Sequence, residues 1–104
     1  MTVYVDNMRA PFGRMVMCHM IADSTEELVA MARRIGVNPK WIQKPGTPRE
    51  HFDISLGCKA RALVEGAVLI DQRDTARMVR FRRERGRLGT PEEARAAYAT
   101  GEEL

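Results

Sequence analysis

MVMCHMIADS, residues 15–24, holds an apolar run, a histidine and a helix start within ten letters. Its first eight residues lack polar/apolar alternation, which predicts a central strand covered on both faces. Ser24, followed three residues later by Glu27, is a capping box and predicts that a helix begins there. His19 stands inside the apolar run, with Asp23 four residues on. This stretch therefore sets a strand-to-helix order and contains a candidate site.

The rest of the chain alternates strand and helix signals in the same way. Runs of apolar, aromatic or β-branched residues predict strands at 3–5, 15–22, 41–43 and 67–70. Capping residues, apolar spacing and glycine stops predict helices between Ser24 and Gly36, at 55–65, at 73–85 and from Thr90. Residues 8–14 are predicted to form a loop or turn, and residues 44–50 a loop with one helical turn from Thr47 to Glu50. The buried faces predicted for the first two helices hold Leu28, Met31, Ala32 and Ile35, and Leu56, Ala60, Leu63 and Val64.

Strands that alternate with helices predict a compact α/β layer fold in a single domain. We expect a small, mostly parallel sheet of three to four strands with flanking helices. In this prediction residues 1–88 form the α/β domain, and residues 89–104 form a C-terminal helical extension of the same domain. A chain of 104 residues has the length of one domain.

Composition and targeting signals favour a protein of a reducing compartment. Apolar residues make up 44% of the chain and charged residues 30%, which is ordinary for a globular domain. Its two cysteines cannot build a disulfide framework. Asp6, Arg9 and Arg14 interrupt any signal-peptide core, and no apolar run approaches the ~20 residues that a membrane span needs. We therefore expect a cytoplasmic location and no membrane partner.

Two histidines and three carboxylates make up the candidate site. The catalytic candidates are His19, His51 and Asp53, and the candidate ligands of a divalent metal are Asp6, His19, Asp23, His51 and Asp53. Imidazole and carboxylate suit Zn, Mn and Fe, and histidine also suits acid–base chemistry near neutral pH. On a strand, His19 and Asp23 would share one face because they are four residues apart. His51 and Asp53 would reach them from the predicted loop.

Each of these residues also has a purely structural interpretation. A lone histidine in an apolar run usually donates a hydrogen bond inside the core. Asp23 and Asp53 each precede a predicted helix and are candidate N-caps, and Asp6 is a candidate strand end. None of the spacings matches a zinc motif such as HExxH or CxxC. The sequence pattern leaves both interpretations open.

Arginines in the two predicted loops are candidate phosphate ligands. Arg9 and Arg14 flank the turn of RAPFGR, and Arg49 lies in KPGTPRE. Arginine forms bidentate hydrogen bonds with phosphate or carboxylate groups. The alternative is a pair of solvated turns.

The segment from Arg73 to Arg87 is strongly basic. It contains seven arginines and two acids, whereas the whole chain has a net charge of only +3. Arginines along a helix neutralise phosphates. The candidate contacts with nucleic acid or an acidic partner are therefore Arg77, Arg80, Arg82, Arg83 and Arg85. The alternative is a solvated helix face, or one that pairs with the C-terminal acids Glu92, Glu93, Glu102 and Glu103.

Four short motifs, taken in order, resemble a known family. They are VYVDNMR near the start, MCHMIADS, HFDIS after a proline-bearing loop, and EGAVLI. Together they are similar to the bacterial and phage family named domain of unknown function 4031, over about residues 2–70. The resemblance implies that the family's pattern ends before the arginine-rich and Thr90 helices and includes Asp6, His19, Asp23, His51 and Asp53. Some relatives are fused to metal-dependent HD-type phosphohydrolase domains, which favours a nucleotide ligand.

The leading hypothesis is a small α/β protein that binds or hydrolyses a phosphorylated ligand, a nucleotide or nucleic acid, in a His/Asp pocket. A divalent metal is the candidate cofactor. This hypothesis requires His19 and His51 to lie within about 10 Å of each other, because metal–ligand bonds are about 2.0–2.2 Å long. The alternative is a non-catalytic interaction protein, a phage- or plasmid-type accessory subunit or inhibitor that uses the Arg73–Arg87 helix. A homodimeric structural module is a third hypothesis.

Overall fold

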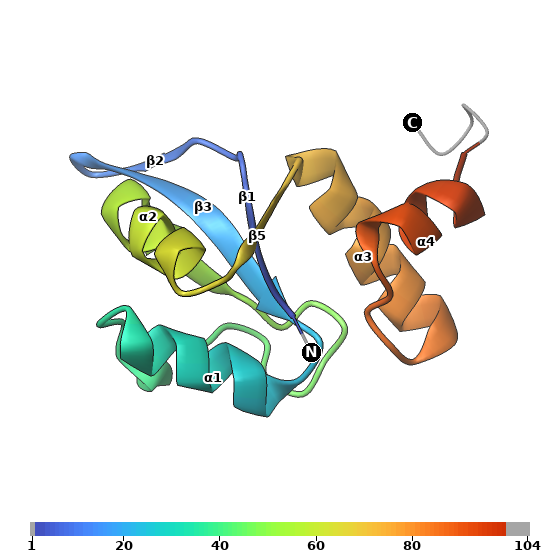
Figure 1. The fold of residues 1–104 in the computed structure, drawn as a ribbon, viewed down its shortest axis with the longest axis horizontal. Coiled ribbons are helices and arrows are strands. Elements are labelled where there is room, and N and C mark those ends of the chain that lie inside the picture. The colour runs from blue at the N-terminus through green and yellow to red at the C-terminus, as the bar shows by residue number, and fades with distance from the viewer. Residues whose placement is uncertain (1, 100–104) are drawn as a thin grey trace.

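The computed structural model describes residues 2–99 and shows an α/β fold (Figure 1). Within these residues the strands of one five-stranded sheet are β1 (Val3–Asp6), β2 (Ala10–Phe12), β3 (Met15–Ala22), β4 (Phe52–Ser55) and β5 (Val68–Ile70). The helices are α1 (Thr25–Arg34), α2 (Leu56–Val64), α3 (Gln72–Arg85) and α4 (Pro91–Ala97), with a 3₁₀ turn, η1, at Pro39–Trp41. The radius of gyration is 13.1 Å, as expected for one compact domain of about this length. The predicted α/β class is confirmed.

The sheet is mixed, so the prediction of a mostly parallel sheet with three to four strands is wrong. Among the described strands, only β1 and β5 pair in parallel, and β3 pairs antiparallel with β1, β2 and β4. The RAPFGR stretch is one cause, because it forms β2 and turns back into β3 instead of staying a loop. A tight turn can join only antiparallel strands. Gly13 supplies the positive φ, 61°, in this turn.

A bulge separates β1 from β2 along one edge of β3. Val5 pairs with Met20, and Ala10 pairs with Met17. The chain therefore advances five residues from β1 to β2 while β3 advances only three, which leaves two extra residues on the β1–β2 side. The bulge begins at Asp6, which pairs with Ile70 of β5 but has no partner residue in β3. Bulges re-aim side chains and leave backbone groups without their ladder partners. The free backbone N–H groups at this bulge therefore need an acceptor from outside the ladder.

The side chains of β3 alternate between two separate cores. Cys18, Met20 and Ala22 pack with α1 and α2, whereas Ile21 packs with α3 and α4. Figure 1 shows the two helix pairs on opposite sides of the sheet. The end of β3 near Ala22 is buried, whereas its start near Met15 is exposed and lies away from the part that α3 covers. His19 lies at the boundary, half-buried on the α3 side of the sheet.

The segment between α1 and α2 differs most from its prediction. Residues 39–41 form η1, and from the predicted strand at 41–43 only Gln43 makes an isolated bridge. Thr47–Glu50 is a single turn closed by a hydrogen bond from the Glu50 backbone N–H to the Thr47 carbonyl, and it does not extend into a helix. The residues that follow form β4 rather than a loop.

Helix starts are capped as predicted at Ser24 and Thr90, whose side chains accept from backbone N–H groups of α1 and α4. Ser55 caps α2, so the interpretation of Asp53 as that cap is wrong.

The buried face predicted for α1 is confirmed, because all four residues are at most 2% exposed. The face predicted for α2 is wrong: Ala62 is buried there, and Val64 is 86% exposed. Apolar residues at the exposed end of a short helix gave a misleading period.

The C-terminal part of the described chain packs on α3. Ala94 and Tyr98 join the core that α3 forms with the sheet. These residues belong to the predicted C-terminal extension, of which Glu102 and Glu103 lie outside the described residues. No helix within residues 2–99 has the length and apolar character needed to cross a bilayer.

Gly89, in the loop between α3 and α4, is expected to tolerate no side chain. Its φ is +71°, and a Cβ atom there would lie 2.8 Å from the buried Phe81 ring. Gly89→Ala should lower the free energy of unfolding by about 2–4 kcal/mol through backbone strain and overpacking. Gly46→Ala, with a φ of +75° but open space around it, should cost only about 1–2 kcal/mol. Urea unfolding measures both, and equal losses would contradict this packing.

Candidate functional site

A buried carboxylate holds the site together. Asp6, the last residue of β1, is fully buried. Its Oδ1 accepts hydrogen bonds from the backbone N–H groups of Met8, at 3.1 Å, and His19, at 3.0 Å. Its Oδ2 accepts from the Thr75 hydroxyl and from Nδ1 of His19, both at 2.8 Å. The side chain thus replaces the ladder partners lost at the bulge and joins β1, β3 and α3.

These contacts fix the ionisation of Asp6 and the tautomer of His19. Burial alone would raise the pKa of Asp6, but the hydrogen bonds from His19 and Thr75 outweigh it and hold that pKa below its usual value. An ionised carboxylate only accepts, so Nδ1 of His19 carries a proton. The same hydrogen bond raises the pKa of His19, against the opposing effect of burial. When the ring is neutral, its free lone pair is therefore on Nε2.

His51 reaches the same tautomer through a different contact. Its Nδ1 lies 2.7 Å from the carbonyl oxygen of Arg49, which can only accept a hydrogen bond. Nδ1 therefore donates, and the neutral ring keeps its lone pair on Nε2, 3.5 Å from Oδ1 of Asp53. His51 and Asp53 are two residues apart in extended chain, so they share a face, while Phe52 between them enters the opposite core.

Cross-strand pairing brings His19 to this pair. His19 lies opposite Asp53 in the β3–β4 register, and the centroids of the His19 and His51 rings are 5.4 Å apart. One nitrogen or oxygen atom from each of the three side chains lies within 4.8 Å of the others. The separation that the metal hypothesis requires of the two histidines is therefore met. Two imidazoles and one carboxylate are the ligand set of many catalytic zinc and non-haem iron sites.

Each of the three side chains is also held by a second contact. Asp6 and the Arg49 carbonyl hold the two imidazoles, and Nε2 of Gln43 donates to Oδ2 of Asp53 at 2.5 Å. Metal-binding side chains commonly have such outer partners, which orient them and tune their basicity. Gln43 and Thr75 are absent from the sequence prediction, because no motif marks them and only the folded register brings them here.

The predicted set of five metal ligands does not assemble as a whole. Three form the cluster just described, and Asp6 stands behind it as the partner of His19. Asp23 lies outside the cluster, where its Oδ2 accepts from the backbone N–H of Thr2 at 2.9 Å. The shared-face argument for Asp23 fails because β3 ends at Ala22.

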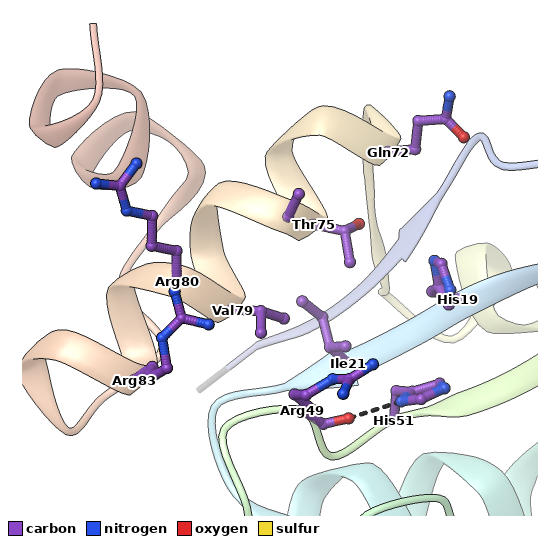
Figure 2. A pocket seen from close by; sticks show the side chains of 10 residues that line it. His19, Ile21, Arg49, His51, Gln72, Thr75, Val79, Arg80 and Arg83 are labelled. Carbon is purple, nitrogen blue, oxygen red and sulfur yellow. Dashed lines mark hydrogen bonds between the residues drawn. The ribbon is translucent and has the colours of Figure 1, made fainter. Parts of the chain in front are cut away.

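A cleft of about 430 Å³ opens between this cluster and α3 (Figure 2). His19 and His51 line it from the sheet, Arg49 from the loop before β4, and Arg80 and Arg83 from α3. Within residues 2–99, the guanidinium groups of Arg49 and Arg83 make no hydrogen bond or ion pair. Two unpaired cations beside two imidazoles favour an anionic ligand in this cleft.

The other predicted arginines are placed differently. Arg9 and Arg14 lie on the β2–β3 hairpin, exposed and away from the cleft lining. Four of the five predicted arginines of α3 make intrachain contacts: Arg77 with Asp74, Arg80 with Glu84 and Tyr98, Arg82 with the Ala22 carbonyl, and Arg85 with Phe81. Of the C-terminal acids, Glu93 pairs with Arg87 and Glu92 with Arg95. The alternative in which the basic segment pairs with these acids therefore holds for Arg87.

Asp6→Asn should lower the free energy of unfolding by about 2–3 kcal/mol, because it removes hydrogen bonds to a charged acceptor. The His19 contribution is complete below its unfolded pKa of about 6.5 and disappears as the pH rises through the raised folded pKa. The Asp6 contribution is present above its unfolded pKa of about 3.8 and disappears as the pH falls through the lowered folded pKa. Urea unfolding should therefore show the largest loss between about pH 4 and 6.5.

NMR titration of the imidazoles gives the matching readout. The pKa of His19 should fall in Asp6→Asn and stay raised in Thr75→Val, which leaves the contact between His19 and Asp6 intact. An unchanged His19 pKa in Asp6→Asn would show that the contact does not set the ionisation of the ring.

Comparison with known proteins extends the resemblance seen in the sequence. No curated protein and no solved structure matches the chain. The family match runs from residue 3 to residue 82, so it includes β1 to β5 and most of α3, rather than ending near residue 70, and it leaves out α4. Since the match covers well over half of its length, the chain belongs to the family described as Protein of unknown function (DUF4031).

Proposed function

We propose that this protein binds a divalent metal through His19, His51 and Asp53 and hydrolyses a phosphoester bond of a nucleotide or nucleic acid in the adjoining cleft. The observation that carries the proposal is a pair of imidazoles whose Nδ1 atoms are both engaged, which leaves two Nε2 lone pairs near one carboxylate. A catalytic metal site needs three such protein ligands and an open position. Zn²⁺, Mn²⁺ and Fe²⁺ are the candidate ions, because they accept mixed nitrogen and oxygen ligands.

The cleft supports a phosphorylated ligand because it offers two guanidinium groups that form no hydrogen bond or ion pair within residues 2–99. Arg49 and Arg83 approach from opposite walls, and His19 and His51 lie on the sheet beside them. A guanidinium group binds phosphate oxygens through two parallel hydrogen bonds. A phosphoryl group held by these arginines would lie next to the proposed metal ligands.

The proposed reaction is the attack of water on phosphorus. The water oxygen forms a new P–O bond, the ester P–O bond breaks, and the proton lost by water goes to the leaving oxygen. The metal would supply a more acidic bound water. Arg49 and Arg83 would offset the charge that develops on the phosphoryl oxygens. Asp6, which contacts no ligand in this scheme, would keep the His19 ring oriented.

Isothermal titration of the metal-free protein with Zn²⁺ or Mn²⁺ tests the ligand set. Loss of a residue that only orients a metal ligand costs about 10–100-fold in metal affinity. His51→Ala and Asp53→Asn each remove a ligand itself and should therefore weaken metal binding by more than this. Asp23→Asn is the matched control: it removes the same charge outside the cluster, and affinity should change about twofold or less. Equal effects of Asp53→Asn and Asp23→Asn would contradict this ligand set.

Hydrolysis of bis(p-nitrophenyl) phosphate tests the reaction independently of any natural substrate. The metal-loaded protein should hydrolyse it, and EDTA should abolish the activity. A protein that takes up no metal, but binds nucleic acid in a manner lost in Arg77→Gln and Arg85→Gln, would instead support the non-catalytic interaction protein.

Arg83→Gln should weaken the binding of a nucleoside monophosphate by about tenfold or more, because it removes a charge-assisted hydrogen bond to phosphate. Arg73→Gln removes the same charge from an exposed position of α3 outside the cleft, and its effect should be within about twofold. Titration calorimetry measures both variants. Indistinguishable losses would mean that the ligand responds to the net charge of α3 and not to the cleft.

A further inference from the structure

We propose that the β2–β3 hairpin is a base-stacking platform, so that the ligand of the neighbouring cleft is a single-stranded nucleic acid. This inference rests on the proposed function, because it takes the cleft as the place where a phosphate binds. It goes beyond that function by naming the part of the molecule that binds the bases and by excluding a mononucleotide as the complete ligand.

Two large apolar side chains lie exposed at the end of the hairpin. Phe12 is 66% exposed and Met15 is 48% exposed. They are direct cross-strand partners, so their side chains stand on the same face of the sheet. Burying each of these side chains would contribute about 1.5–3 kcal/mol of favourable free energy. The fold does not bury them, so this free energy is available for binding a partner. An aromatic ring with an open face is the element on which nucleobases stack without sequence preference.

The register places this pair on the same sheet face as the cleft. Met15 and His19 are four residues apart in β3, so both side chains point to the α3 side. Met17 lies between them on that face, opposite Ser55 of β4. The α3 side of the sheet therefore forms one continuous surface, from Phe12 at the hairpin to the two histidines.

The length of this surface favours an oligonucleotide. Four residues of a strand span about 13 Å at about 3.3 Å per residue. Successive nucleotides of a stacked strand advance by about 3.4 Å. A base on Phe12 and a phosphate beside His19 would therefore belong to different nucleotides of one strand. A base inside a duplex is stacked on both faces and offers none to Phe12, which favours a single strand.

Positive charge lies at both ends of the surface. Arg9 lies just before β2 and Arg14 in the turn between β2 and β3. Like Arg49 and Arg83 in the cleft, both make no hydrogen bond or ion pair through their guanidinium groups within the described chain. A polyanion that crosses the face would meet unpaired cations where it enters and where it leaves. A second copy of this chain would place the same arginines against each other. Charge complementarity therefore selects a nucleic acid over a dimer contact.

Fluorescence anisotropy with a labelled eight-nucleotide DNA, measured in EDTA, tests the platform without the metal or the reaction. Phe12→Ala should weaken binding by about 5- to 100-fold, the loss expected from one base–aromatic stack. Trp41→Ala is the matched control, because Trp41 is similarly exposed, at 64%, but lies on η1 away from the hairpin. Its effect should be within about twofold. Arg14→Gln should lower the slope of log affinity against log salt by about 1.

Further probes separate the possible outcomes. An RNA of the same length distinguishes the two kinds of single strand, and binding of either in the manner described supports the proposal. Binding of the corresponding duplex as tightly as the single strand would overturn it, as would equal effects of Phe12→Ala and Trp41→Ala. A concentration-dependent dimer that dissociates in Phe12→Ala would overturn it in favour of a contact between two copies. A failed metal titration with intact, Phe12-dependent binding of the octamer would reject the proposed hydrolysis and leave the platform standing.

Discussion

The Asp6 carboxylate is the contact on which the candidate site depends. The bulge after β1 removes ladder partners from backbone N–H groups, and Oδ1 of Asp6 accepts from two of them. Its Oδ2 accepts from β3 and from α3, through His19 and Thr75. A buried charge is tolerated only when such donors surround it. The same interaction therefore closes the sheet, docks α3 and orients one imidazole, so that fold stability and site geometry cannot be changed independently here.

Strand parity explains how two distant segments form one cluster. The alternation that sends Cys18 and Met20 into one core leaves His19 on the other face, and the same rule separates Phe52 from Asp53. The α3 helix covers only part of that second face, so His19 of β3 and His51, the residue before β4, line an open cleft instead of a core. The cluster lies where the helical layer ends, which is also where solvent and a ligand have access.

The sequence predicted local features well and spatial ones poorly. The β3 strand, the Ser24 and Thr90 caps and the buried face of α1 follow from patterns within a few residues, and these predictions are confirmed. The mixed sheet was missed, because the short β2 strand contains proline and looks like a turn. Asp23 was predicted to share a face with His19 because side chains alternate along a strand, but β3 ends at Ala22, so the alternation does not reach Asp23. Gln43 and Thr75 were missed because the folded arrangement alone brings them to Asp53 and Asp6. No motif or periodic spacing in the sequence marks such partners.

The central claim is that His19 and His51 both present an unprotonated Nε2 to a single metal ion, with Nδ1 held by Asp6 and by the Arg49 carbonyl. Nitrogen-15 NMR of the imidazoles measures this directly, because it distinguishes protonated from unprotonated ring nitrogens. At a pH at which both rings are neutral, the metal-free protein should show both rings with the proton on Nδ1, and one equivalent of Zn²⁺ should shift both Nε2 resonances together. A proton on Nε2 of either ring, or a shift confined to one histidine, would contradict the account.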